Sequence, residues 1–205
     1  MPITDLVAIV KDVAVAVAAA ITATAAVIGL SSWNRELKGK ATFKVARALA
    51  RATYKLRDGI KACRAPFLAA SEFPAGYGGH RDRDTAYRED ADALAHVYGN
   101  RWKFVWEALQ EFDTNTLEAE AVWGNVVRMK TDALRQCVVE LRIGIDALIE
   151  NTAARGEHFK TDRNFEKEMR SKASTASGAE NALTRKIEEA VQGIEGVVRP
   201  HLKRG

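Results

Sequence analysis

The stretch VAVAVAAAITATAAVIGL, from Val13 to Leu30, decides the fold of the N-terminal part of the chain. It contains no charged residue. As a helix rising ~1.5 Å per residue it covers roughly 27 Å, which is close to the hydrocarbon thickness of a bilayer. Trp33 follows it, where an interfacial aromatic side chain belongs. The sequence therefore predicts one transmembrane helix at about residues 13–30, within an N-terminal segment of residues 1–32.

Two alternatives to a membrane span stay open. Alanine and threonine supply more than half of the stretch and add little to membrane insertion, so a buried core helix of a water-soluble bundle competes with the span. A cleaved signal peptide is less favoured, because the leading residues 1–5 (MPITD) lack a basic region. An A-x-A-like stretch does occur from Ala23 to Ala25.

Small residues recur at every fourth position of the predicted span. This spacing forms one stripe on a helix, along which a second helix can approach closely in lipid. We therefore expect a homo-oligomer that associates through Ala14, Ala18, Thr22 and Ala26.

The segment after the predicted span is strongly basic. Ten lysines and arginines and two acidic residues lie between Trp33 and Arg64, a net charge of +8, whereas Lys11 is the one basic residue before Val13. This bias predicts that the C-terminal side is cytoplasmic. Contact with anionic membrane lipids is expected at Arg35, Lys38, Lys40, Lys44, Arg47, Arg51, Lys203 and Arg204.

The same basic segment has two other interpretations. It could be the solvated face of a helix, or it could bind the phosphate backbone of a nucleic acid. The nucleic-acid interpretation is the least favoured, because the charges stand next to a predicted span.

Residues 33–205 predict an all-α cytoplasmic domain. Apolar residues recur there at spacings of three and four in four segments, which is typical of amphipathic helices. With short connections these helices predict an antiparallel four-helix bundle, and the third contains a heptad-like stretch typical of a coiled coil. The four segments run from about Asn34 to just before Pro66, from Thr85 to Phe112, from about Leu117 to Asn151, and from about Leu183 to Arg199.

The connections between these helices are predicted from polar and glycine-rich stretches. Residues 71–84 and 152–162 are expected to be loops, and Arg163–Lys172 a short charged helix. The run from Asp113 to Thr116 is expected to break the chain, because its side chains suit a helix N-cap. Trp102 and Trp106 are expected to fill the core.

No motif in the sequence predicts catalysis, a metal or a cofactor. None of the four histidines has a glutamate three residues before it, as a di-iron bundle requires, or an arginine at the spacing of helical ribonucleases. The glycine-rich Gly76–His80 lacks the Lys-Ser/Thr ending of a phosphate loop and is expected to form a turn. Cys63 and Cys137 are predicted to be buried, reduced thiols.

Three stretches resemble a family of uncharacterised bacterial proteins that are anchored in the membrane by a single span. They are WNRELKGKATFKVARALARATYKLRDGIKACRAPF (Trp33–Phe67), GEHFKTDRNFEKEMRSK (Gly156–Lys172) and the ending IEGVVRPHLKRG. The similarity extends over nearly all of the part after the span. It implies a bacterial inner-membrane protein and carries over no activity or site residue.

The expected function is that of a non-enzymatic, membrane-anchored helical module that self-associates or docks a cytosolic protein. A different class, an oligomeric pore or membrane-perturbing effector in a stress or anti-phage response, is suggested by Thr22 and Thr24 in a weakly hydrophobic span. A membrane-tethered nucleic-acid-binding module is the third alternative.

Overall fold

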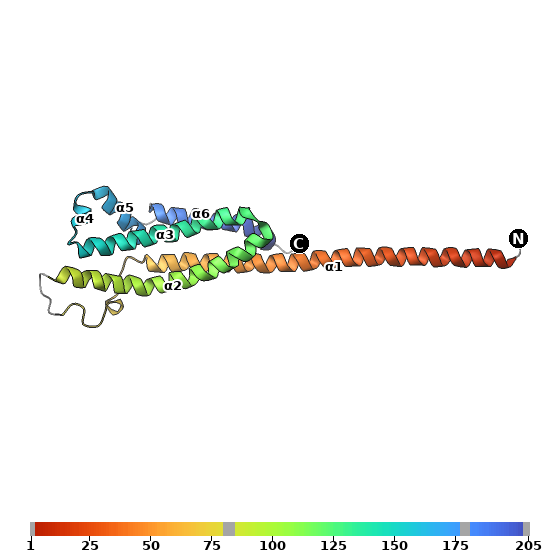
Figure 1. Ribbon diagram of the computed structural model, residues 1–205, viewed down its shortest axis with the longest axis horizontal. Helices are drawn as coiled ribbons and strands as arrows, with labels where there is room; N and C mark the ends of the chain where they lie inside the picture. Colours follow the sequence, from red (N-terminus) through yellow and green to blue (C-terminus); the bar gives the residue numbers. More distant parts are fainter. Residues whose placement is uncertain (1–2, 80–84, 177–180, 203–205) are drawn as a thin grey trace. The chain divides into compact units, whose positions relative to one another are not determined.

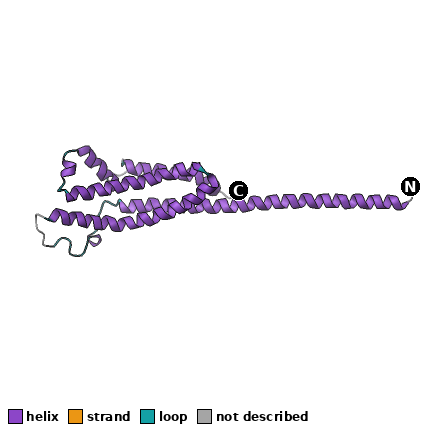
Figure 2. Cartoon of the chain, viewed as in Figure 1, coloured by secondary structure: helices purple, strands orange, loops and turns teal. Residues whose placement is uncertain are grey.

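The computed structural model describes residues 3–79, 85–176 and 181–202, and most of these residues are helical. Side chains are described for Lys11 and from Val15 onward within these ranges. Figure 2 shows helices joined by loops, and the described residues include no strand. The elements are α1 (Ile3–Cys63), a 3-10 helix (Ala70–Glu72), α2 (Ala86–Trp123), α3 (Asn125–Ala153), α4 (Glu157–Lys160), α5 (Arg163–Ala173) and α6 (Ala182–Leu202) (Figure 1).

The chain divides into two compact units, Met1–Lys44 and Val45–Gly205. Helix α1 belongs to both, because it continues without interruption where the sequence predicted a span and then a second helix beginning near Asn34. The serines after the apolar stretch do not end the helix. The Ser31 hydroxyl donates to the Ile28 carbonyl over 2.9 Å, so this polar side chain is satisfied within the helix itself.

The C-terminal part of α1 is one wall of the core of the second unit. Leu49, Leu56 and Ile60 are fully buried, at the helical spacing that the sequence predicted. Phe67, which continues the three- and four-residue apolar spacing of these positions beyond Cys63, is 77% exposed. It lies outside the helix, because α1 ends at Cys63, and so the helical periodicity no longer directs its side chain inward.

Helices α2 and α3 form a hairpin, and the predicted break at Asp113–Thr116 is wrong. The chain turns at Gly124, whose φ of 71° is the left-handed conformation that glycine adopts most easily. The hydroxyl of Thr114 donates to Gln110 and the side-chain amide of Asn115 to Glu111, each to the carbonyl of the preceding turn. These side chains therefore bond within a continuous helix and do not cap a new one.

Helix α5 lies against α3 at an unusually close approach. A β-carbon added to Gly144 would stand 2.6 Å from the β-carbon of Lys172 and 3.0 Å from the backbone oxygen of Met169. Only a residue without a side chain lets the two backbones approach this closely. Helix α6 packs on another part of α3 (Figure 1).

Three further boundaries differ from the prediction. Helix α6 passes through Pro200 and is described to Leu202, whereas the sequence predicted an end at Arg199–Pro200. The predicted loop 152–162 contains the short helix α4, and the predicted loop 71–84 begins within the 3-10 helix. Asp162, at the end of the former loop, caps α5 by accepting from the backbone N–H groups of Asn164 and Phe165.

Trp102 and Trp106 of α2, both predicted to fill the core, do not both do so. Trp106 is 52% exposed, and Trp102 is half-buried with the Arg142 guanidinium 5.3 Å from its ring centre. The residues that fill this layer are Val105 and Phe112, which are fully buried. The prediction is therefore wrong for Trp106, whereas Trp102 packs partly buried against the core.

Candidate functional site

The first candidate site is the apolar part of α1, from Val15 to Leu30. It is the one helix in the described part of the chain that is long and apolar enough to cross a membrane. Its large side chains are exposed: Ile21 by 64%, Val27 by 69% and Leu30 by 70%. A core helix of a water-soluble bundle would bury such residues, so the exposure argues against that alternative.

The predicted association stripe lies within this helix. Ala18, Thr22 and Ala26 are exposed, whereas the side chain of Ala14 lies outside the described residues. The hydroxyl of Thr22 donates to the Ala18 carbonyl over 2.8 Å, which keeps the polar group from needing a partner elsewhere. A neighbouring helix could therefore approach the stripe without leaving a hydroxyl unsatisfied.

The basic residues predicted to contact anionic lipid have different surroundings. All six described members are exposed, whereas Lys203 and Arg204 lie outside the described residues. Lys40 pairs with Glu36 at 2.7 Å, and Arg51 lies 3.5 Å from Glu111 of α2. The remaining four make no ion pair with another described residue: Arg35, Lys38, Lys44 and Arg47.

Arg64, the last cation of the basic segment, is 1% exposed and therefore does not belong to any surface patch. Its guanidinium donates to the backbone oxygens of Ser171, Lys172 and Ser174, which stand at the C-terminal end of α5. It also donates to the side chains of Thr184 and Asn181 at the beginning of α6.

Burial lowers the pKa of the Arg64 guanidinium, but five acceptors surround it and compensate for the lost hydration. No local pattern predicted this role of Arg64, because its partners lie more than 100 positions further along the chain. Arg64 ties together the ends of α1, α5 and α6.

Arg101 of α2 holds the connection that follows α1 through hydrogen bonds. It donates to Glu72 at 2.5 and 2.8 Å and to the carbonyls of Ala65 and Phe67 at 2.8 and 2.7 Å. The hydrogen bond from Arg101, together with the backbone N–H of Ala69, lowers the pKa of Glu72 to about 2. Both arginines are thus structural clamps and take no part in the expected anionic-surface contact.

Among the described residues, the cysteines and histidines form no cluster that could hold a metal ion. Cys63 and Cys137 are buried and unpaired, as the sequence predicted, and burial raises the pKa of each thiol to about 11. Within the described residues, no three His, Cys, Asp or Glu side chains gather to hold a metal ion. The His201 ring stacks on Trp123 with centres 4.7 Å apart, and His80 lies outside the described residues.

Comparison with known proteins identified no similar protein. No protein-family model matches the chain, and no curated protein or solved structure matches it. The resemblance to single-span bacterial proteins therefore stays a prediction from the sequence.

Proposed function

We propose that this protein is a non-enzymatic, membrane-anchored helical module of the bacterial inner membrane, which self-associates through its span and presents a cytoplasmic domain to a cytosolic protein. The observation that carries the proposal is the exposure of the apolar side chains from Val15 to Leu30. Exposed apolar surface on this scale needs lipid or another apolar helix to cover it. A span in lipid that packs against a second copy provides both.

The proposed cytoplasmic domain is a four-helix bundle made of the C-terminal part of α1 with α2, α3 and α6. Contacts between neighbours support it. Lys55 of α1 bonds Glu111 of α2 at 2.6 Å, and Tyr54 of α1 donates to Glu195 of α6 at 2.9 Å. Helix α3 packs against both α2 and α6. Each helix thus has two neighbours, as in an antiparallel bundle.

The cytoplasmic orientation rests on the exposed cations that follow the span. Arg35, Lys38 and Lys44 are solvent-exposed and available to anionic headgroups, in keeping with the preference of lysine and arginine for the cytoplasmic side. Orientation is testable with Glu188→Cys, an exposed position on α6. A membrane-impermeant maleimide should label it in lysed cells and not in intact spheroplasts; labelling of intact spheroplasts would reverse the topology.

Membrane anchoring is tested by flotation of the full chain with liposomes after an alkaline carbonate wash. The wild-type protein should float. The double substitution Val17→Asp/Ile21→Asp should leave it in the dense fraction, because charged groups at the centre of a span cost several kcal/mol in total, about 2.5–3.5 each. The matched control is Ile143→Asp, which changes an exposed apolar residue of α3 and should still float. A wild-type chain that stays in the dense fraction would disprove the anchor.

Self-association is tested by the molar mass of the detergent-solubilised full chain. Ala18→Ile/Thr22→Ile places bulky side chains on the stripe. We expect it to raise the dissociation constant of the oligomer at least tenfold, so that more of the protein is monomeric. Ala16→Ile/Ala20→Ile makes similar changes on the other side of the same helix and should preserve the oligomer. Equal effects of the two pairs, or a monomeric wild-type protein, would contradict association through the stripe.

A pore has less support than a self-associating anchor. The hydroxyls of Thr22 and Thr24, which motivated that alternative, donate to the carbonyls of Ala18 and Ala20 over 2.8 Å each. Threonine hydroxyls satisfied in this way are compatible with lipid and need no water-filled lumen. Release of a trapped dye from vesicles that contain the inserted protein would favour the pore.

A further inference from the structure

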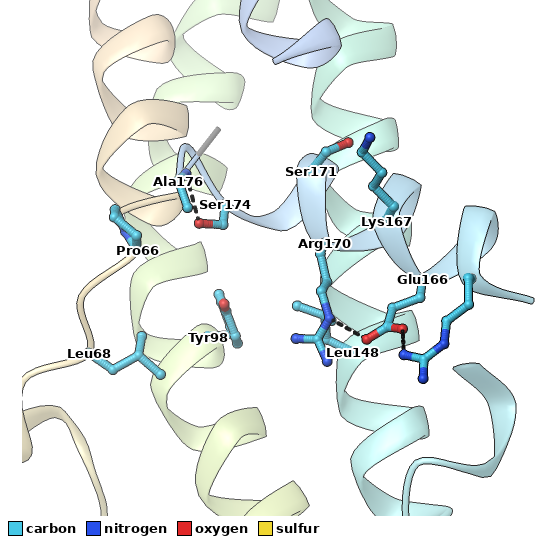
Figure 3. A pocket seen from close by; sticks show the side chains of 11 residues that line it. Pro66, Leu68, Tyr98, Leu148, Glu166, Lys167, Arg170, Ser171, Ser174 and Ala176 are labelled. Atoms are coloured by element: carbon cyan, nitrogen blue, oxygen red, sulfur yellow. Dashed lines mark hydrogen bonds and ion pairs between the residues drawn. The ribbon is translucent and has the colours of Figure 1, made fainter. Parts of the chain in front are cut away.

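A pocket of about 540 Å³ lies in the second unit and is lined by residues of α5, α2, α3 and the connection after α1 (Figure 3). Its volume is within the range typical of sites for small organic ligands. Apolar side chains line one part of it, among them Leu148 of α3 and Leu68 of the connection after α1. Charged side chains from α5 line the other part. The pocket thus offers an apolar surface and an ionic edge to the same molecule.

The charged edge has a positive balance. Arg163, Lys167 and Arg170 supply three cations, and Glu166 supplies the one carboxylate among the lining residues. Glu166 accepts from Arg170 Nε at 2.9 Å and from Arg163 Nη1 at 3.0 Å, so one carboxylate is shared by two guanidinium groups. These bonds lower the pKa of Glu166, which therefore stays ionised and holds both arginines in place.

Donors remain available at this edge after the internal pairs are formed. Arg170 uses Nε for Glu166 and its guanidinium carbon lies 5.8 Å from the centre of the Phe159 ring, whereas its two Nη groups make no hydrogen bond with a described residue. The ammonium of Lys167 likewise has no ion pair or hydrogen bond with a described residue, and its side chain is exposed. A guanidinium with two free Nη groups can bind a carboxylate or phosphate through two parallel hydrogen bonds.

Tyr98 supplies a further hydrogen-bonding group to the pocket. This α2 residue is 8% exposed and lines the pocket, and its hydroxyl makes no hydrogen bond with another described residue. Thr116 Oγ1 is the one fully buried side-chain polar atom without a partner among the described residues, so the Tyr98 hydroxyl is accessible from the pocket and can bond a ligand there. Figure 3 shows Tyr98 and Arg170 entering the pocket region from α2 and α5.

We propose that this pocket binds a small amphipathic anion, a carboxylate or phosphate group carried on an apolar chain. The anionic group pairs with Arg170 and Lys167, the chain lies against Leu148, and the Tyr98 hydroxyl completes its hydrogen bonding on the ligand. The proposal does not depend on membrane anchoring or self-association, because every residue in it belongs to the second unit.

Calorimetric titration of the full chain in phosphatidylcholine nanodiscs tests the proposal, with empty discs as the blank. The probes are hexanoate, hexyl phosphate, hexanol and inorganic phosphate. Both amphipathic anions should bind saturably with one site per chain, at least tenfold tighter than hexanol, which lacks the charge, and than inorganic phosphate, which lacks the chain. Equal binding of hexanol and hexanoate, or no saturable binding of either anion, would overturn the proposal.

Three variants locate the binding to the pocket. Arg170→Gln/Lys167→Gln should weaken hexanoate binding at least tenfold, and Tyr98→Phe roughly three- to tenfold, as expected for one hydrogen bond. The matched control Arg185→Gln/Lys61→Gln removes an exposed arginine and lysine elsewhere and should bind like the wild type. An unchanged affinity in a folded Arg170→Gln/Lys167→Gln variant would overturn the assignment; circular dichroism melting reports the folding.

The natural anion could be a soluble molecule or part of a lipid. Nanodiscs that contain phosphatidylglycerol distinguish these sources once hexanoate binding is established. Loss of hexanoate binding in those discs identifies a lipid phosphate as the competitor for the same residues. Unchanged binding identifies a soluble anion.

Discussion

The Arg64 guanidinium donates a 2.7 Å hydrogen bond to the side-chain oxygen of Asn181, which stands 117 positions further along the chain. The same oxygen accepts from the backbone N–H of Thr184, so Asn181 also caps the beginning of α6. Its side-chain amide donates to the carbonyls of Ser171 and Ser174 at the end of α5. The buried pair of Arg64 and Asn181 therefore connects the C-terminal ends of α1 and α5 with the beginning of α6.

Replacing Arg64 should destabilise the second unit. In Arg64→Met the five acceptors of the guanidinium lose their donor inside the protein, at a cost of about 2–4 kcal/mol in the free energy of unfolding. Urea denaturation followed by circular dichroism measures the change. Arg128→Met removes an arginine whose side chain is 65% exposed and should change the stability by less than about 0.5 kcal/mol. Equal losses in the two variants would refute the clamp.

Gly144→Ala should weaken the packing of α5 on α3. The added β-carbon would overlap with Lys172, and the backbone of Met169 leaves it no room, so we expect a loss of about 1–3 kcal/mol in the free energy of unfolding. Gly99→Ala is the control on α2, because nothing lies within 4 Å of its added β-carbon. That variant should gain up to about 1 kcal/mol from the better helix propensity of alanine. A neutral or stabilising Gly144→Ala would contradict the close approach.

Glu72 should make the stability of the protein fall in acid. Its pKa is about 2 in the folded chain and 4.5 ordinarily, so its contribution is complete above about pH 4.5 and is lost as the pH falls towards 2. In Glu72→Gln the free energy of unfolding should vary less with pH over that interval. Glu188→Gln, at an exposed position that has no partner among the described residues, should keep the wild-type dependence. Identical pH profiles for wild type and Glu72→Gln would disprove the effect.

The two native cysteines should resist alkylation in the folded protein. Both are buried and the pKa of each is raised to about 11, so little thiolate exists at neutral pH. Reaction with iodoacetamide at pH 7 should be at least roughly a hundredfold slower than in denaturant. Mass spectrometry gives the rate, and a cysteine placed at exposed Glu188 supplies the reference within the same chain. Fast labelling of Cys63 or Cys137 under native conditions would show that the core opens.

Local patterns in the sequence predicted most helices and many core residues. Leu49, Leu56 and Ile60 are buried as their spacing indicated, since every third or fourth residue of a helix returns to the same face. The break at Asp113–Thr116 was wrong, because threonine and asparagine can bond either to a new helix as caps or to the preceding turn. Gly124 was the stronger signal for the turn between α2 and α3.

By itself the sequence determined the helical class, the apolar stretch of α1 and the burial of the two cysteines, because these depend on composition and on periodicity along one helix. Only the tertiary structure decided that Arg64 is a buried clamp, that Gly144 allows α5 to approach α3, and that Tyr98 and Arg170 line one pocket. The physical reason is distance along the chain. A residue's own helix fixes the direction of its side chain, whereas its partners come from helices that only folding brings together.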